Sequence, residues 1–560
     1  MLLDVLFDAF RERRAIRLNN RGDQLWQQGR TAEAENCFRS AIRTDPSCAL
    51  AFSNLGMLLM ARHRYEDGFK LIKRAAALNP THSGILVNYG NGLMMAGQVQ
   101  EAVRQYQKAL ELDPNNSRLA ASLVRPLLDV CDWDGIDQLL ARTRSRQDTD
   151  TALDVIQPFN ALFLPLSRRE QLNIARNCAK AYEREFTPLK PRTARSSPRI
   201  KVGYLSADFH DHATAHLTLG LYHRHDRSRF EVYAYSLGHP DEGLYRKKIM
   251  GDCDHFLDVH SLDDAQIATR IQADGIDILL DMKGYTGGSR PGILAMQPAP
   301  VQVNYLGYPG SMGADFVPYL IADPVLIPES HEIDYSERIV RLPDSYQPND
   351  DQQAISERFQ SREEAGLPAK GFVMCGFHAS AKITRSTFTA WLELLKRIPG
   401  SVLWLLKLPP EAESRLNNAC AAAGIDPSRM IQAQALPKAD HLSRLRFADV
   451  FLDTFTCNAH TTASDALWAK VPVVTLTGET FASRVATSLL HAVWLPELCA
   501  RSEIQYLEIV SNLAADPRLL SHLKLHLAQG NALPLFNTDR YVKNLDNVLE
   551  QLLAKHKVTT

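Results

Sequence analysis

Residues 49–82 have the sequence ALAFSNLGMLLMARHRYEDGFKLIKRAAALNPTH, and the same 34-residue pattern precedes and follows them. Five columns keep one residue type in all three copies, although each type makes up only about 5–10% of average proteins. The columns are Asn20, Asn54 and Asn88; Gly22, Gly56 and Gly90; Leu25, Leu59 and Leu93; Ala41, Ala75 and Ala109; and Pro46, Pro80 and Pro114. Chance cannot reasonably produce this agreement, and a period of 34 residues predicts stacked pairs of helices.

The repeated residues suit two helices that pack closely. Small side chains let the helices approach, the leucines face the seam between them, and each proline stops the second helix. We therefore expect three tetratricopeptide repeats, at residues 15–48, 49–82 and 83–116. They would form a helical arm over residues 1–145, with further helices in 117–145 capping the stack.

The asparagine column is notable because packing of such a stack does not require asparagine. An amide side chain can both donate to and accept from the backbone of an extended peptide. Asn20, Asn54 and Asn88 are therefore candidate peptide-binding residues. The alternative is that these amides form hydrogen bonds within the repeats.

Composition places the chain among ordinary globular proteins of several domains. Of its 560 residues 45% are apolar and 23% charged, and the net charge of −1 gives no strong field toward nucleic acid or an anionic membrane. No apolar stretch reaches the 18 residues that suggest a membrane span, and Asp4 and Asp8 interrupt the apolar start of the chain. Nine cysteines without a CxxC pair suggest reduced thiols. We expect a cytoplasmic protein without nucleic-acid or membrane partners.

The second half of the chain alternates short apolar strands with helical patterns. Strands are expected at residues 200–209, 277–282, 371–377, 401–408, 450–455 and 472–476, with helices at 383–398 and 460–470. Such alternation predicts an α/β fold with parallel sheets covered by helices on both faces. We expect a helical linker over 146–197, a first α/β domain over 198–350, and a second over 351–560 with a closing helix.

The segment 458–465, NAHTTASD, is the best candidate for a phosphate site. Ligands of parallel α/β sheets bind beyond the carboxyl ends of the strands, where a helix N-terminus attracts anions. Thr461 and Thr462 add hydroxyl donors, and Asp465 could accept from ribose hydroxyl groups; ordinary helix capping is the alternative. Lys382 is expected to open a helix, where a lysine is explained by a bound anion or else by simple solvation.

Other motifs exclude several kinds of site. The chain has neither a GxxxxGK[ST] loop nor a GxGxxG after a strand, which argues against P-loop hydrolases and dehydrogenases. His210, His212 and His216 lack the HExxH glutamate and have few neighbouring acids, so a metal site is the weaker hypothesis. A histidine general base is the stronger one, because its pKa lies near neutrality.

Four strings carry a resemblance to a known family. They are VGYLSADFHDHATAHL (202–217), GYTGGSRPGILAMQPAPVQVNYLGYPGSMGADF (284–316), SVLWLLKLP (401–409) and ADVFLDTFTCNAHTTASDALWAKVPVVTLTGETFASRVATSLL (448–490). Joined to tetratricopeptide repeats, they resemble the bacterial members of the protein O-GlcNAc transferase family. The resemblance implies a GT-B fold, with two Rossmann-like domains facing a cleft. It also implies inverting transfer of N-acetylglucosamine from UDP-GlcNAc to serine or threonine hydroxyls of acceptor proteins, with no metal and no cofactor.

The resemblance also assigns roles to individual residues. His212 corresponds to the proposed catalytic base, and Lys382 to the lysine that neutralises the departing diphosphate. The nucleotide contacts would be Leu436, Pro437, Lys438, His441, Arg444, His460, Thr461, Thr462 and Asp465, and the loop beside the sugar would contain Leu306, Gly307 and Pro309.

Two departures from the family keep alternatives open. Ala379 stands where the animal enzymes carry a glutamine that touches the nucleotide, and the two catalytic halves are joined by a short link. A protein O-fucosyltransferase that uses GDP-fucose is therefore the closest alternative. A non-catalytic peptide-binding scaffold and a nucleotide-sugar epimerase are alternatives of other classes.

Overall fold

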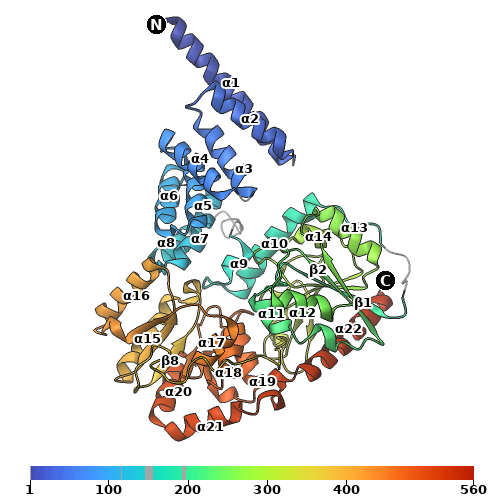
Figure 1. The fold of residues 1–560 in the computed structure, drawn as a ribbon, viewed down its shortest axis with the longest axis vertical. Helices are drawn as coiled ribbons and strands as arrows, with labels where there is room; N and C mark the ends of the chain where they lie inside the picture. Colours follow the sequence, from blue (N-terminus) through green and yellow to red (C-terminus); the bar gives the residue numbers. More distant parts are fainter. Residues whose placement is uncertain are drawn as a thin grey trace. The chain divides into compact units, whose positions relative to one another are not determined.

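The computed structural model describes residues 2–28, 30–62, 64–114, 116–144, 156–191 and 197–559. The chain divides into two compact units, Met1–Gln147 and Asp148–Thr560. The described part of the first unit is helical, and the second unit contains two parallel β-sheets with helices around them (Figure 1). The predicted succession of a helical superhelix and an α/β module is confirmed.

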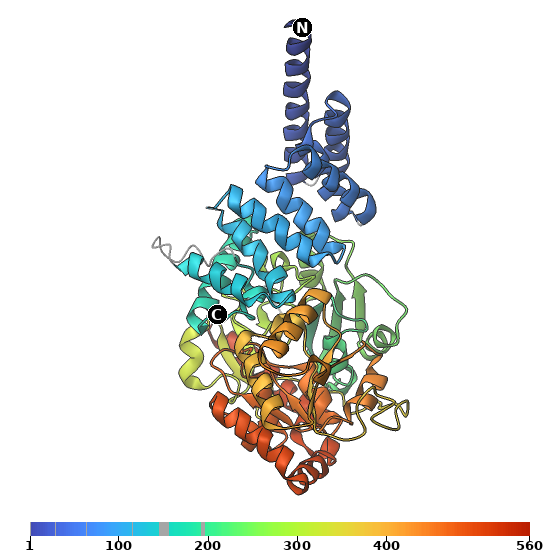
Figure 2. The same cartoon turned by 90° about the vertical axis from the view of Figure 1, so that its left-hand side faces the viewer.

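The first unit is a succession of helical hairpins (Figure 2). Its helices are α1 (Leu2–Gln27), α2 (Thr31–Thr44), α3 (Ala49–Ala61), α4 (Tyr65–Leu78), α5 (Ser83–Met95), α6 (Val99–Leu112), α7 (Ser117–Asp129) and α8 (Trp133–Arg144). Each odd-numbered helix packs against the even-numbered helix that follows it. Helix α1 begins well before residue 15, where the first repeat is predicted to start, and the hairpin α7–α8 follows the third repeat.

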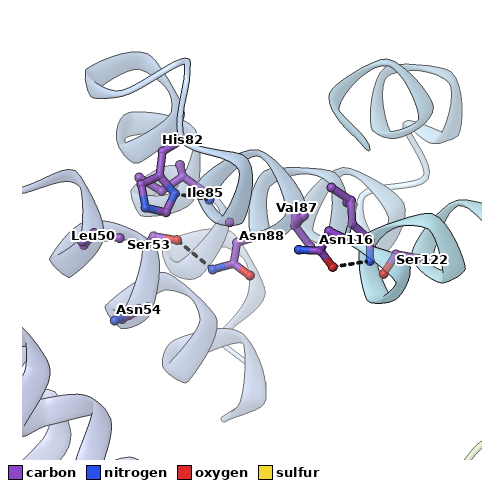
Figure 3. A pocket seen from close by; sticks show the side chains of 11 residues that line it. Leu50, Ser53, Asn54, His82, Ile85, Val87, Asn88, Asn116 and Ser122 are labelled. Atoms are coloured by element: carbon purple, nitrogen blue, oxygen red, sulfur yellow. Dashed lines mark hydrogen bonds between the residues drawn. The ribbon is translucent and has the colours of Figure 1, made fainter. Parts of the chain in front are cut away.

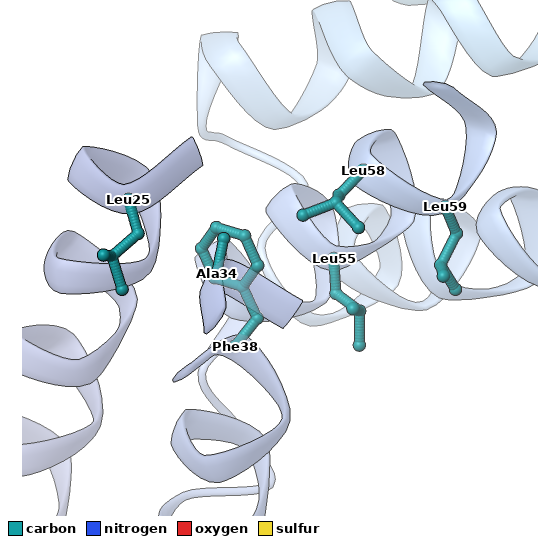
Figure 4. Packing of buried hydrophobic residues seen from close by; sticks show 6 residues of the cluster. All are labelled: Leu25, Ala34, Phe38, Leu55, Leu58 and Leu59. Atoms are coloured by element: carbon teal, nitrogen blue, oxygen red, sulfur yellow. The ribbon is translucent and has the colours of Figure 1, made fainter. Parts of the chain in front are cut away.

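The repeated columns explain this packing. A Cβ atom on Gly56 would lie 2.5 Å from Ile72 Cγ1 and 2.8 Å from the Gly68 carbonyl oxygen, so only glycine lets α3 and α4 approach this closely. The leucine column supplies core: Leu25 and Leu59 belong to one buried cluster (Figure 4), which also contains Ala34, Phe38, Leu55 and Leu58. Helices α2, α4 and α6 each end two residues before a repeat proline, as its missing N–H group requires.

The second unit begins with a helical segment and a seven-stranded sheet. Helices α9 (Pro158–Ala161) and α10 (Arg168–Glu185) lie in the predicted linker, of which residues 146–155 and 192–196 are outside the described residues. The strands are β1 (Ile200–Ser206), β2 (Phe230–Ser236), β3 (His255–Asp258), β4 (Ile278–Asp281), β5 (Val301–Asn304), β6 (Tyr319–Ala322) and β7 (Arg338–Arg341). They are parallel, in the order β3-β2-β1-β4-β5-β6-β7.

A second parallel sheet of six strands follows. Its strands are β8 (Val373–Gly376), β9 (Val402–Leu406), β10 (Met430–Ala433), β11 (Val450–Leu452), β12 (Val473–Leu476) and β13 (Cys499–Ala500). Its strand order is β10-β9-β8-β11-β12-β13. As in the first sheet, successive strands are first added on one side of the first strand, and the later strands are then added on its other side. Ligands bind at such reversal points, which here lie between β1 and β4 and between β8 and β11.

Helices cover both sheets. Those of the first domain are α11 (Ala213–Thr218), α12 (Leu244–Asp252), α13 (Asp264–Asp274) and α14 (Pro291–Ala295). Those of the second are α15 (Arg385–Arg397), α16 (Pro410–Ala422), α17 (Lys438–Leu445), α18 (Thr461–Trp468), α19 (Val485–Ala492), α20 (Glu503–Ala515) and α21 (Pro517–Leu527). Short 3-10 turns, among them η3 (Ser380–Lys382), join these elements.

The last helix, α22 (Thr538–Thr559), packs on the first α/β domain. Its Asp546 Oδ1 lies 2.5 Å from the buried His225 Nδ1, whose Nε2 lies 2.7 Å from the Tyr204 hydroxyl. Its Tyr541 hydroxyl lies 2.7 Å from the Tyr305 hydroxyl and donates to the Tyr346 carbonyl at 2.7 Å. The end of the chain thus ties the two α/β domains together.

Candidate active site

A cavity of about 520 Å³ lies among the strand ends of both α/β domains. Its walls come from the segments after β1, β4 and β5 in the first domain and after β8 and β11 in the second. These are the carboxyl ends at the two reversal points, so the topology brings the segments together. Of the predicted site residues, His212, Leu306, Gly307, Pro309, Lys382, His460, Thr461 and Thr462 line this cavity.

His212 stands at the first wall as the N-cap of α11. Its Nδ1 accepts a hydrogen bond from the Thr214 backbone N–H at 3.2 Å and lies 3.5 Å from Asp208 Oδ2. Burial lowers the pKa of His212, Asp208 opposes this effect, and Lys283 adds to it. The ring is therefore neutral over most of the physiological pH range.

A neutral imidazole carries one hydrogen, so the two nitrogens of His212 differ in role. When Nδ1 accepts from Thr214, the hydrogen is on Nε2, and that nitrogen can only donate. When Nδ1 instead carries the hydrogen toward Asp208, Nε2 is free to accept a proton. The site can therefore use His212 as a base only in the second tautomer.

An ion pair that sequence reasoning missed lies beside His212. Lys283 Nζ donates to both carboxylate oxygens of Asp208, at 2.6 and 2.8 Å. Lys283 is only 4% and Asp208 only 6% exposed, yet both line the cavity. The turn that carries Lys283 is held by Asp281, which accepts from the Lys283 and Gly284 backbone N–H groups at 3.0 Å each. The available signal was a lysine directly after the buried strand DILLDM.

Lys382 stands at the second wall, and its local structure differs from the expectation. It does not open a helix: it ends the 3-10 turn η3, and α15 begins at Arg385 after the N-cap Thr384. The Lys382 backbone N–H closes this turn by donating to the Ala379 carbonyl at 2.9 Å, and the segment before it is anchored through His378 Nε2, 2.7 Å from the Leu452 carbonyl oxygen. Lys382 Nζ donates to the Asn458 carbonyl at 2.5 Å, which holds it beside the segment that precedes α18.

The segment between β11 and α18 is shaped by Asp453, another residue that sequence reasoning missed. Its carboxylate accepts from the Thr454 and Ala459 backbone N–H groups, at 2.8 and 2.6 Å, and from Thr475 Oγ1 at 2.6 Å. Burial raises the pKa of Asp453 to about 6. These three bonds fold the chain back, so that the start of α18 forms part of the cavity wall.

The start of α18 offers several groups to an anion. The first N–H groups of a helix have no acceptor within that helix. Thr461 and Thr462 add hydroxyls, and the buried His460 Nε2 has no hydrogen-bond partner among the described residues. Burial holds the pKa of His460 well below its usual range, and Lys382 lowers it further. His460 is thus neutral, and the positive charge here comes from Lys382 and the helix dipole.

The other predicted nucleotide contacts do not line the cavity themselves. Leu436, Pro437, Lys438, His441 and Arg444 lie at or near α17, and Asp465 lies in α18. Asp465, only 5% exposed, forms an ion pair with Lys438, and His441 Nε2 lies 3.9 Å from the same carboxylate. Phe377 connects this group to the cavity: it lines the wall, and its ring lies 5.4 Å from that of His441 and 5.1 Å from the Arg444 guanidinium.

The loop after β5 brings Leu306, Gly307 and Pro309 to the cavity. Leu306 has a left-handed backbone with φ of 71°. A Cβ on Gly307 would lie 1.9 Å from the Met282 carbonyl oxygen, so this position accepts only glycine. The loop therefore passes directly over the end of β4, close to Lys283.

Further wall residues escaped sequence reasoning. Phe159 and Phe163, from the segment of α9, line the cavity and pack edge to face with ring centroids 5.3 Å apart. Gln347 also lines it and donates to Ser464 Oγ at 2.6 Å, while its buried Oε1 has no partner in the described structure. No local motif marks these residues, because each reaches the cavity from an element far away in the sequence.

A separate groove of about 350 Å³ lies in the first unit (Figure 3). Asn54 and Asn88 line it, and Asn20 is not among its lining residues. The hydrogen bonds within the repeats do form: Asn88 Nδ2 donates to Ser53 Oγ at 2.8 Å and Asn54 Nδ2 donates to Asn19 Oδ1 at 3.0 Å. Asn20 Oδ1 accepts from Asn19 Nδ2 at 3.4 Å. These amides therefore have a structural role as well as a place on the groove.

The described residues contain neither a side-chain cluster suited to a metal ion nor a helix suited to crossing a bilayer. Nowhere in these ranges do three or more histidine, cysteine, aspartate or glutamate side chains gather so that they could hold a metal ion. None of the helices described combines the length and apolar composition that crossing a bilayer demands.

Comparison with protein families matches both parts of the chain. The profile of Glycosyl transferase family 41 matches residues 130–358 and 353–545. Two tetratricopeptide-repeat profiles match residues 19–83 and 83–116.

Individual proteins agree with this result. The chain is 36% identical, over 445 residues, to the Arabidopsis thaliana protein described as "Probable UDP-N-acetylglucosamine--peptide N-acetylglucosaminyltransferase SEC", covering 76% of this chain and 46% of the relative. It is 27% identical to the Caenorhabditis elegans "UDP-N-acetylglucosamine--peptide N-acetylglucosaminyltransferase", covering 76% and 48%. The chain spans about half the length of these curated relatives. The solved structure of a mutant O-GlcNAc transferase from Thermobaculum terrenum superposes with a TM-score of 0.71, at 26% identity and 99% coverage of both chains.

Proposed function

We propose, since this chain belongs to Glycosyl transferase family 41, that it transfers N-acetylglucosamine from UDP-GlcNAc to serine or threonine hydroxyls of proteins. The transfer would invert the anomeric carbon and need neither a metal ion nor another cofactor. The observation that carries the proposal is the cavity at the two reversal points, where Lys382 and the start of α18 meet the His212 wall. The descriptions of the relatives support the choice of sugar nucleotide.

Lys382 and α18 would stabilise the departing diphosphate. Breaking the bond to the anomeric carbon leaves negative charge on the phosphate oxygens, and fixed donors aimed at such charge are usually the largest catalytic contribution. The lysine ammonium, the free N–H groups of the first helical turn and the Thr461 and Thr462 hydroxyls are donors of this kind. Together they would replace the divalent cation that other transferases use.

His212 would assist the acceptor hydroxyl. In the tautomer whose Nδ1–H points to Asp208, its Nε2 could take the hydroxyl proton as the bond to the sugar forms. General base assistance of this kind contributes about 10²–10⁴-fold to a rate. The proton would end on the imidazole and pass to water after the product leaves, because burial and Lys283 favour the neutral ring.

The nucleoside and the sugar would be held by neighbouring segments. The residues at α17 are proposed to hold uracil and ribose, with Asp465 exchanging its Lys438 partner for ribose hydroxyls. The loop of Leu306, Gly307 and Pro309 is proposed to lie against the sugar.

The groove of the first unit is proposed to bind an extended segment of the acceptor protein. Asn54 and Asn88 line it, and each uses only its N–H side in the hydrogen bonds given above, so the carbonyl oxygens can accept from a peptide backbone.

The cytoplasm is the proposed compartment. All nine cysteines are free thiols, which is typical of proteins in reducing compartments. The near-zero net charge supports the absence of nucleic acid and membrane surfaces from its partners.

The proposed function is tested by measuring sugar transfer to peptides. A mixture of serine- and threonine-containing peptides would be incubated with UDP-GlcNAc or GDP-fucose and analysed by mass spectrometry, and calorimetry would compare UDP with GDP. We expect N-acetylhexosamine on peptide hydroxyls and binding of UDP. Fucose transfer with GDP binding would favour the fucosyltransferase alternative, which Ala379 on the cavity wall keeps open. Peptide binding without transfer would favour the non-catalytic scaffold, and an epimerised sugar nucleotide would indicate an epimerase.

A further inference from the structure

We propose that Lys283 is a positioning residue for this transfer: by holding the Asp208 carboxylate, it keeps His212 neutral when the acceptor hydroxyl arrives. This role rests on the proposed function, because a neutral imidazole matters only if His212 acts on a hydroxyl. Neither the motifs nor the family resemblance gives Lys283 a role.

The geometry makes the three side chains one electrostatic unit. Asp208 follows β1 and Lys283 follows β4, and these strands are hydrogen-bonded neighbours with Leu205 opposite Asp281. The ammonium group contacts both Asp208 oxygens, and one of these oxygens lies 3.5 Å from His212 Nδ1. The lysine and the aspartate are almost completely buried, so water screens their charges poorly.

The groups that face His212 act in opposite directions. Asp208 favours the protonated ring, whereas Lys283, His210 and His216 disfavour it. His210 lies with its ring centroid 5.6 Å away, and His216 Nε2 is paired with Asp211 Oδ1 at 2.6 Å. Lys283 is the lysine that also binds the opposing carboxylate, so it both cancels the charge of Asp208 and repels a proton on His212.

Removing Lys283 would leave a buried carboxylate without its partner. A buried charge that loses its counter-ion recruits another, and the nearest group able to become a cation is His212. A protonated His212 cannot accept the hydroxyl proton. Removing Asp208 instead would leave Lys283 alone, and the ring would hold its proton less tightly than in the wild type.

The opposite signs provide the test. Histidine NMR titrations of the unliganded full chain would follow the His212 ring in the wild type, in Lys283→Met, in Asp208→Asn and in the double variant, with His212→Gln assigning the signal. We expect the pKa of His212 to rise in Lys283→Met, to fall in Asp208→Asn and to return close to the wild-type value in the double variant. Shifts of the same sign in both single variants, or no shift in either, would overturn the proposal.

Two controls separate this effect from damage to the fold. Lys201 lies at the other end of β1, where its Nζ donates to the Asp274 carbonyl at 2.9 Å, so Lys201→Met should leave the His212 titration unchanged. Should Lys283→Met not fold, the downward shift in Asp208→Asn carries the test, and an upward shift there contradicts the proposal.

Activity provides the second readout and separates the two proposals. In Lys283→Met, turnover at pH 7 should fall roughly tenfold or more and recover as the pH is raised, with UDP binding retained. If the NMR shifts occur but the wild type transfers no sugar, the proposed function fails while the control of His212 by Lys283 stands. If the wild type transfers sugar and the acid limb of its pH profile coincides with that of Lys283→Met, the positioning role is wrong.

Discussion

The ammonium group of Lys382 lies 2.5 Å from the carbonyl oxygen of Asn458, 76 residues further along the chain. The contact joins the segment after β8 to the segment after β11, at the reversal point of the second sheet. It places a fixed positive charge beside the start of α18, where the departing diphosphate is proposed to lie.

Lys382→Ala should lower kcat by about 10²–10³-fold, the usual loss when a donor to a developing anion is removed. The thermal midpoint should change little, because the ammonium group makes one contact with a backbone carbonyl. Steady-state kinetics and thermal unfolding measure the two effects. Lys370→Ala, an exposed lysine just before β8, is the matched control and should retain full activity. Wild-type turnover in Lys382→Ala would refute the diphosphate role.

His212→Ala should reduce transfer by about 10²–10⁴-fold while the affinity for UDP stays nearly unchanged. The reason is that His212 lies on the wall opposite the proposed diphosphate site and would act on the acceptor. Product formation and calorimetry with UDP check the two halves of this expectation. His210 is a neighbouring ring that does not line the cavity, so His210→Ala should remain active. Equal losses in both variants would exclude a specific role for His212.

The double variant Asn54→Ala and Asn88→Ala should raise KM for protein acceptors without changing the affinity for UDP. Both amides line the groove of the first unit and would no longer meet a peptide backbone there (Figure 3). Kinetics with a protein acceptor and calorimetry with UDP measure the two quantities. Asn418→Ala, an exposed change on α16, should leave both unchanged. An unaltered KM in the double variant would rule out the groove as an acceptor site.

Asp453 should make the stability of its surroundings depend on pH. Burial raises its pKa to about 6, so between about pH 4 and pH 6 the folded protein holds a proton that the unfolded chain has released. Stability due to this group therefore falls as the pH rises through that window, by about 3 kcal/mol in total.

Hydrogen exchange of the β11 and β12 amides, in the wild type and in Asp453→Asn, measures this contribution locally. The substitution also changes hydrogen bonds, but this cost is the same at every pH. The stability advantage of the wild type over the variant should therefore shrink by about 2 kcal/mol from pH 4 to pH 7. A difference that does not vary with pH would contradict the raised pKa.

Gly56→Ala should destabilise the hairpin α3–α4 by about 1–3 kcal/mol, the usual cost of an extra methyl group in a full core. The new Cβ would overlap Ile72 and the Gly68 backbone. Hydrogen exchange of the α3 and α4 amides reports this locally. Gly251→Ala in α12 is the control: its Cβ would meet nothing within 4 Å, so this change should be neutral or slightly stabilising. Unchanged protection of α3 would show that the two helices can move apart at little cost.

Local chemistry made much of the fold predictable. The 34-residue period specified the paired helices because each column has a physical task, and the prolines mark the ends of α2, α4 and α6. In the second unit, the expected strands at β1, β4, β8, β9, β11 and β12 are present, somewhat shorter than predicted. The strands β2, β3, β5, β6, β7, β10 and β13 were not predicted, since several are short or mix polar with apolar residues.

Part of the candidate site could likewise be predicted from local sequence, and part could not. The sequence by itself pointed to the start of α18, with Thr461 and Thr462, because a helix start depends on neighbours a few positions away, whereas Gly307 was expected only from the family resemblance. Only the tertiary structure decided that Lys283 neutralises Asp208, that Asp453 shapes the segment before α18, and that Lys382 follows a 3-10 turn. Each of these contacts joins the ends of different parallel strands. Strand order sets which ends are adjacent, and burial sets how strongly their charges interact; neither property is contained in a local stretch of sequence.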